Sequence, residues 1–65
     1  KLMAYLTDQA KLKRSNDFTI PFNRQELADY LGVERSAMSA ELGKLTKLGI
    51  LRTQRSHFTL LKPLD

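Results

Sequence analysis

The spacing of apolar residues divides the first part of this chain into a helix and a strand. Over Lys1–Lys13 apolar side chains recur every three or four positions, which predicts a helix with one apolar face. That face consists of Leu2, Met3, Leu6 and Ala10. The polar stretch Arg14–Asp17 is typical of a turn and ends the helix. Apolar and polar residues then alternate over Phe18–Phe22, which predicts a short strand. Pro21 confines this strand to a sheet edge because proline has no backbone donor.

Two further helices are predicted over Arg24–Leu31 and Arg35–Leu48, where apolar residues again follow helical spacing. Asn23 and Glu26 form a capping box at the start of the first, in which each side chain accepts a hydrogen bond from the other residue's backbone amide. Gly32 stands where a left-handed residue ends that helix. Helices joined by so short a turn cross steeply, which is typical of a helix-turn-helix motif that offers its second helix to the major groove of DNA.

The last part of the chain is predicted to form a β-hairpin. Its strands are Ile50–Gln54 and the stretch from Phe58 to Leu61, the tip is the basic segment Arg55–His57, and Pro63 ends the second strand. Because a lone hairpin is only marginally stable in water, we expect it to pack against the helices and to pair with the first strand. The predicted fold class is therefore α+β: a winged helix-turn-helix with three helices and a small antiparallel sheet, made of the wing hairpin and a short edge strand.

Length and composition indicate one small domain that covers residues 1–65. This length is near the lower limit for a domain stabilised by a single core. The chain has no cysteine for a disulfide or a thiolate metal site, and no apolar run of membrane length. We therefore expect no membrane partner and a cytoplasmic location. Because the first residue is Lys1, we also expect the chain to be a fragment of a longer protein.

The charge balance favours an anionic partner such as nucleic acid. The formal net charge is +4, from 11 basic and 7 acidic residues. The alternative is that surplus lysines serve only solubility. The placement of the charges favours nucleic acid further, because the segment from Lys44 to Lys62 carries basic residues and no acid.

The predicted helix over Arg35–Leu48 has an exposed face made of small residues. Met38, Leu42 and Leu45 form its apolar stripe. Gly43 lies opposite and destabilises a helix by about 1 kcal/mol relative to alanine. This cost indicates that another molecule approaches the backbone closely. The residues on the exposed face are Ser36, Ser39, Ala40, Gly43 and Lys47.

Such a face suits entry into a DNA groove. Slim side chains allow insertion, while Arg35 and Ser36 in the first turn reach base edges. Arginine can donate a pair of hydrogen bonds to O6 and N7 of guanine. The alternative is a helix packed against another protein, in a winged-helix interaction module without sequence-specific DNA binding.

Four segments carry a resemblance to a known family: IPFNRQELADYLGV, ERSAMSAELGKL, KLGIL and HFTLL. In this order they resemble the C-terminal DNA-binding domain of the Crp–Fnr family of bacterial transcription regulators, and the similarity spans nearly the whole chain. The resemblance implies sequence-specific DNA binding by a transcription regulator. It also implies that an N-terminal effector domain and a dimerisation helix are missing, and that the intact protein binds a palindromic operator as a homodimer. RNA polymerase is a candidate further partner.

The resemblance also assigns residues. Arg35, Ser36 and Ser39 fall on positions that contact DNA base edges in the family, and Arg24 falls on a phosphate-contacting position. Ala40 departs from the family pattern, which very often has an arginine there, so no operator sequence is predicted.

Further phosphate contacts are predicted from Lys47 and from the hairpin-tip residues Arg55, Ser56 and His57. Such contacts position a protein on DNA without specifying sequence. His57 is the only histidine and no cysteine accompanies it, so neither a metal site nor a cofactor is expected. The serines have no evident general base, so the chain is not expected to be an enzyme.

The packing of three further side chains follows from their helical positions. Tyr5 and Tyr30 are expected in the core or at its boundary. Glu41 lies beside the apolar stripe of its helix. Two possibilities stay open for it: an ion pair with Lys44 or Lys47, and a hydrogen bond to a neighbouring backbone group.

Overall fold

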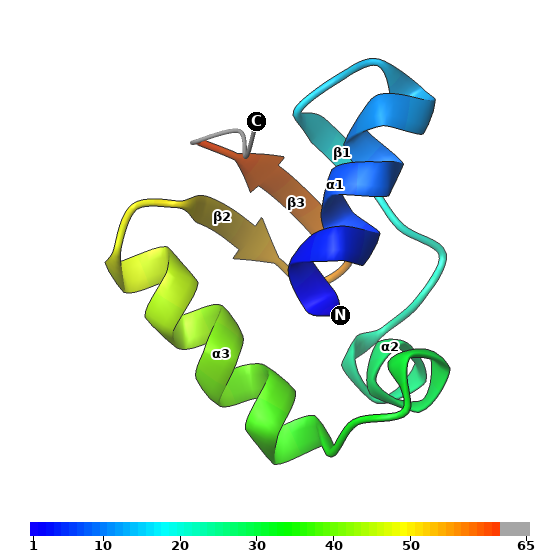
Figure 1. Cartoon of the computed structure of the whole chain (residues 1–65), viewed down its shortest axis with the longest axis vertical. Helices are drawn as coiled ribbons and strands as arrows, with labels where there is room; N and C mark the ends of the chain where they lie inside the picture. Colours follow the sequence, from blue (N-terminus) through cyan, green and yellow to red (C-terminus); the bar gives the residue numbers. More distant parts are fainter. Residues whose placement is uncertain (62–65) are drawn as a thin grey trace.

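This computed structural model describes residues 1–61. They contain three helices and three strands, joined by short turns and loops (Figure 1). In chain order they are α1 (Leu2–Lys13), β1 (Asp17–Thr19), α2 (Arg24–Leu31), α3 (Arg35–Lys47), β2 (Leu51–Gln54) and β3 (His57–Leu60). The predicted α+β class and winged helix-turn-helix arrangement are confirmed. The predicted strand end at Pro63 lies outside the described residues.

The strands form one antiparallel sheet in the order β1-β3-β2, so β3 is paired on both sides. Phe58 in β3 is opposite Phe18 of β1 and opposite Thr53 of β2. The rings of Phe18 and Phe58 stack with their centroids 6.2 Å apart. The expected pairing of the hairpin with the first strand is therefore confirmed. It gives the hairpin the third strand that a stable sheet needs.

The first strand is shorter than the one predicted over Phe18–Phe22, and the prediction was wrong at its C-terminal end. Pairing stops at Thr19 because its partner His57 is the first residue of β3. One more hydrogen bond follows, from the amide of Ile20 to the carbonyl of Ser56 at 2.9 Å. The next residue is a proline, which has no amide hydrogen to continue the ladder.

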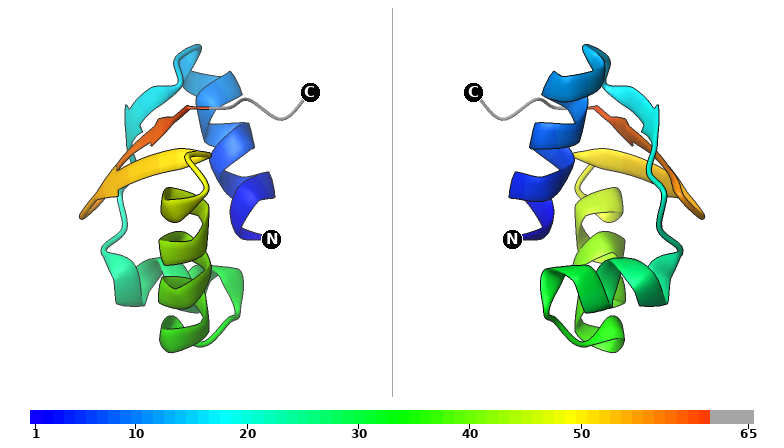
Figure 2. Two further views of the ribbon diagram at one scale, coloured as in Figure 1. Left: turned by 90° about the vertical axis from the view of Figure 1, so that its left-hand side faces the viewer. Right: turned by 90° about the vertical axis from the view of Figure 1, so that its right-hand side faces the viewer.

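The core lies where the helices meet the sheet. α1 contacts β1, α3 contacts β2, and α2 contacts α3 (Figures 1 and 2). All six elements contribute to the core, whose buried apolar residues are Leu2, Leu6, Ala10, Phe18, Ile20, Leu27, Ala28, Met38, Leu42, Leu51, Phe58 and Leu60. No polar or charged side chain among residues 1–61 is buried, so the polar chemistry of this region lies at the surface. None of its helices is long and apolar enough to cross a membrane.

The turn between α2 and α3 is the one predicted from Gly32. This glycine has a φ of 70°, in the left-handed region that glycine adopts at little cost. The amide of the next residue, Val33, donates to the carbonyl of Ala28 at 3.0 Å and closes the helix end. α2 is seen nearly end-on in Figure 1, where α3 runs across the picture, so the two helices cross steeply.

Candidate nucleic-acid interface

The start of α2 is set by the predicted capping box. Asn23 Oδ1 accepts a hydrogen bond from the amide of Glu26 at 2.8 Å, and Glu26 Oε1 accepts one from the amide of Asn23 at 2.9 Å. A capping side chain stabilises a helix by about 0.5–2 kcal/mol. The two bonds fix Arg24 as the first residue of α2.

α3 carries the residues predicted to read bases on its solvent-exposed side. Arg35, Ser36 and Ser39 are exposed, whereas Met38 on the inner side is 2% exposed. Gly43 is also exposed, and a Cβ added there meets no atom within 4 Å. Packing within residues 1–61 therefore does not require glycine at this position.

Four of the predicted DNA-contacting residues meet around one hollow of about 390 Å³, which we call the arginine hollow. It is lined by the start of α2, the start of α3 and the β2–β3 turn, through Asn23, Arg24, Gln25, Arg35, Arg55 and Ser56. No acidic residue of the described chain lines it. Burial lowers the pKa of Arg24, and the positive charge of Arg35 lowers it further. An anion bound in the hollow would relieve this repulsion.

The β2–β3 turn is held against the chain segment that precedes α2. Ser56 Oγ donates a hydrogen bond to the carbonyl of Phe22 at 2.5 Å. Arg55 has a left-handed φ of 55°, which is uncommon for a residue other than glycine, and its side chain is exposed. Ser56 thus anchors the turn while Arg55 stays accessible at the arginine hollow.

The structure does not bring Lys47 and His57 to the arginine hollow. Lys47 is the last residue of α3, at the opposite end from Arg35. His57 was predicted at the hairpin tip, and that placement was wrong. The turn consists only of Arg55 and Ser56, and His57 already pairs with β1 as the first residue of β3.

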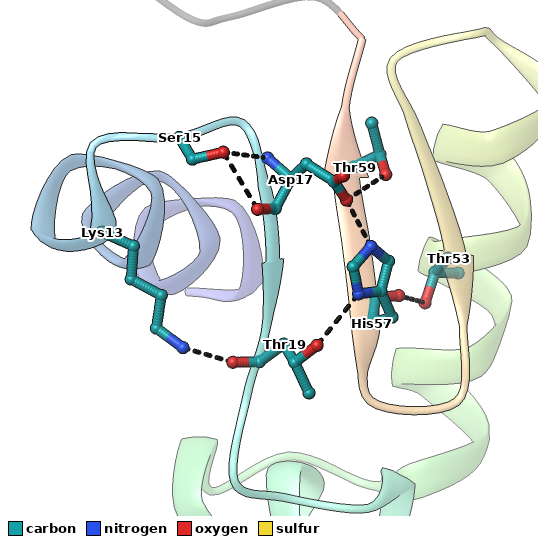
Figure 3. A network of polar contacts seen from close by, with 7 residues as sticks. All are labelled: Lys13, Ser15, Asp17, Thr19, Thr53, His57 and Thr59. Carbon is teal, nitrogen blue, oxygen red and sulfur yellow. Dashed lines mark hydrogen bonds and ion pairs between the residues drawn. The ribbon is translucent and has the colours of Figure 1, made fainter.

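His57 joins β1 and β3 on the outer side of the sheet (Figure 3). Its Nε2 is paired with a carboxylate oxygen of Asp17, and its Nδ1 lies 2.9 Å from Thr19 Oγ1. Thr59 Oγ1 donates to the same Asp17 oxygen at 3.0 Å. Within the described part of the chain, no three side chains of the metal-binding types lie close enough to hold an ion. The cluster therefore ties two strands together.

Asp17→Asn is expected to destabilise the fold more at neutral pH than at about pH 2. Hydrogen bonds from His57 and Thr59 lower the pKa of Asp17 below its ordinary value of 3.8. Because this pKa is lower in the folded state, the charged carboxylate stabilises the fold above the ordinary value, and that contribution is lost as the pH falls through the folded-state pKa. Urea unfolding of both proteins at both pH values measures the effect. Equal destabilisation at the two pH values would contradict it.

Glu41 makes neither of the contacts that the sequence left open. It is exposed, and the ion pairs of residues 1–61 include none with Lys44 or Lys47. The side-chain hydrogen bond to the backbone of α3 comes from Thr46 instead, whose Oγ1 donates to the carbonyl of Leu42 at 2.8 Å.

An aromatic cluster covers the junction of α1 and α2. It places Tyr5 at the core boundary, as expected, but Tyr30 is exposed, and the prediction was wrong for that residue. The ring centroid of Tyr30 lies 5.5 Å from that of Tyr5 and 5.0 Å from that of Phe22. Tyr30 is 63% exposed, whereas Tyr5 is half-buried and its burial raises its pKa. Phe22 belongs to this cluster and not to the strand.

Three residues at or beside the arginine hollow were not predicted from the sequence as part of it. Asn23, identified only as a helix cap, and Gln25 both line the arginine hollow. Thr53 of β2 accepts a hydrogen bond from Arg24 Nη2 at 2.9 Å. No local pattern marks Thr53, because its partner is 29 residues away in the chain.

Comparison with known proteins places the chain in a family. Residues 1–64 match the family model of the Crp-like helix-turn-helix domain. A relative from Rhizobium leguminosarum bv. viciae, named probable transcriptional activator, is 29% identical over 51 residues, which are 78% of this chain and 21% of the relative. The chain thus spans about a fifth of that relative's length. No solved structure matches the chain at a significant level. Since the family model covers nearly every residue, the chain belongs to the Crp-like helix-turn-helix family of DNA-binding, transcription-regulator domains.

Proposed function

We propose that this domain recognises specific sequences in double-stranded DNA by placing α3 in the major groove. One observation carries the proposal: exposed Arg35, at the start of α3, lies beside a hollow that is also lined by Arg24 and Arg55. The major groove is about 12 Å wide and admits an α-helix, and phosphates flank it on both sides. In this arrangement Arg35 would face the base edges in the groove, and the cationic hollow beside it would face the flanking phosphates.

The proposal gives each exposed residue a role. Arg35 donates to guanine, or to another base with paired acceptors, while Ser36 and Ser39 contact base edges one turn apart. Phosphate contacts hold the helix in register and carry the salt dependence of binding. They are assigned to Arg24 and Arg55 at the arginine hollow and to Lys47 at the other end of α3. Ser56 and His57 are left out, because the hydroxyl proton of Ser56 and both ring nitrogens of His57 are already engaged within the fold.

The intact protein is proposed to act as a homodimer on a palindromic operator. Dimerisation is assigned to a part of the protein outside these residues, and RNA polymerase is a candidate partner of the whole assembly. Two linked domains on one duplex raise the effective concentration of the second contact. A single copy is therefore expected to bind weakly. We assign no cofactor and no catalytic step to this domain.

Selection from a randomised duplex pool tests the proposal. The domain is incubated with the pool at low salt, which strengthens phosphate contacts, and the bound duplexes are sequenced. Enrichment of a short half-site is the expected result. Binding without any enrichment would contradict sequence-specific recognition, and a folded sample that binds no duplex would contradict DNA binding altogether.

A protein-interaction module is the competing interpretation, and it predicts a different signature. Its complex would be largely apolar, insensitive to salt and indifferent to DNA sequence. The exposed side of α3 carries Ser36, Ser39 and Gly43 and no aromatic residue. Aromatic and arginine side chains usually supply most of the binding energy in protein interfaces, so this face favours DNA.

A further inference from the structure

The guanidinium of Arg24 is held by both strands of the wing. Its Nη2 donates to Thr53 Oγ1 at 2.9 Å, and its Cζ lies 5.3 Å from the centroid of the Phe58 ring. Thr53 on β2 and Phe58 on β3 are direct partners in the antiparallel ladder. One cross-strand pair therefore provides both the acceptor and the aromatic surface for the first side chain of α2.

Thr53 is oriented as an acceptor for this contact. Its hydroxyl donates to the carbonyl of His57 at 3.1 Å, a bond visible in Figure 3. A hydroxyl has one proton to donate and two lone pairs to accept with. Because the proton is engaged by His57, a lone pair is left for the N–H group of Arg24.

Most of the hydrogen-bonding capacity of Arg24 is left for a ligand. A guanidinium has five N–H donors, and among the side-chain bonds of residues 1–61 Arg24 makes the one to Thr53. The only ion pair in this part of the chain is that of His57 with Asp17, so no carboxylate neutralises Arg24. Arg24 is half-buried and lines the arginine hollow together with Arg35 and Arg55.

We infer that Thr53 is a positioning residue for DNA binding. Its hydroxyl, with the ring of Phe58 beneath, fixes Arg24 in the conformation that presents its remaining donors to a backbone phosphate. An arginine held in place before binding loses less side-chain freedom when it binds. The same contact couples the wing to α2. This inference rests on the proposed DNA binding, and it places an affinity-setting residue inside a strand and away from the hairpin tip.

Thr53→Val tests the inference, because valine keeps the branched shape and the strand preference but removes the hydroxyl. The probe is a mixed-sequence duplex two helical turns long, at low salt. Thr53→Val is expected to bind it roughly three- to tenfold more weakly than the parent. Thr53→Ser, which keeps the hydroxyl, is expected to bind like the parent. Circular dichroism verifies that each variant is folded.

Combining these changes with Arg24→Ala separates positioning from a general effect on the fold. Arg24→Ala is expected to weaken binding and to reduce the salt slope by about one phosphate contact. In that background Thr53→Val is expected to cause no further loss. A further loss as large as in the parent, or parent-like binding by Thr53→Val alone, would overturn the positioning role. If the parent itself binds no duplex, the proposed function fails. If the parent binds and only Thr53→Val is without effect, the inference alone fails.

Discussion

Arg35→Ala is expected to weaken binding to the selected half-site by about 1–3 kcal/mol, which corresponds to roughly 5- to 150-fold in Kd. Arg35 is exposed at the first position of α3, and the proposed function has it contact a base in the major groove. Losing a paired contact with a base removes both affinity and discrimination, so the base at one operator position should become free to vary. Titration of the half-site, and repeated selection with the variant, measure both effects.

Arg52→Ala is the matched control for this prediction. Arg52 is exposed on β2 and lies beside the residues of the outer sheet surface, away from the arginine hollow. The control also removes one positive charge, but at a different place. It should therefore weaken binding to the half-site and to an unrelated duplex equally, and only slightly. If Arg35→Ala weakened both duplexes equally, Arg35 would be a phosphate contact and the base-reading role would be lost.

Phe58→Ala is expected to reduce the free energy of unfolding by about 3–5 kcal/mol. Phe58 is 0% exposed, stacks on Phe18 and lies in the central strand, so its removal leaves a cavity between the sheet and the helices. Domains are stabilised by about 0.05–0.15 kcal/mol per residue, so this loss is a large share of what 65 residues provide. We expect Phe58→Ala to be mostly unfolded at urea concentrations well below the unfolding midpoint of the parent.

Leu12→Ala is the control for this second prediction. Leu12 is 75% exposed on α1, and truncating an exposed side chain usually changes stability by less than about 0.5 kcal/mol. Urea unfolding followed by circular dichroism compares both variants with the parent. Similar midpoints for Phe58→Ala and the parent would show that the core does not depend on the central strand.

Several local features of the fold were predictable from sequence because neighbouring residues decide them. The bonds of Asn23 and Glu26 span three residues, and the turn at Gly32 depends on one glycine and its neighbours. The apolar spacing of α1 and α3 correctly identified the buried side of each helix. Helical periodicity also placed Ser36, Ser39 and Gly43 on the exposed side of α3 before any tertiary contact was known.

The ends of the strands were less predictable from the sequence, because they depend on where the partner strand begins and ends. The alternation over Phe18–Phe22 continues past the last paired residue of β1, and only the start of β3 at His57 ends the ladder. The same register moves His57 from the hairpin tip to the outer side of the sheet, where Asp17, 40 residues away, accepts its hydrogen bond. Sequence spacing contains no information about such a pairing.

The sequence by itself determined the three helices, the short turn between α2 and α3, the exposed face of small residues on α3 and the family. These features follow from contacts between residues a few positions apart, or from short ordered motifs. Only the tertiary structure decided which cationic side chains share one hollow, and that Arg24 is held by Thr53 and Phe58. The physical reason is that these contacts join α2 to the two strands of the wing, so they exist only when strand register and helix packing are both established.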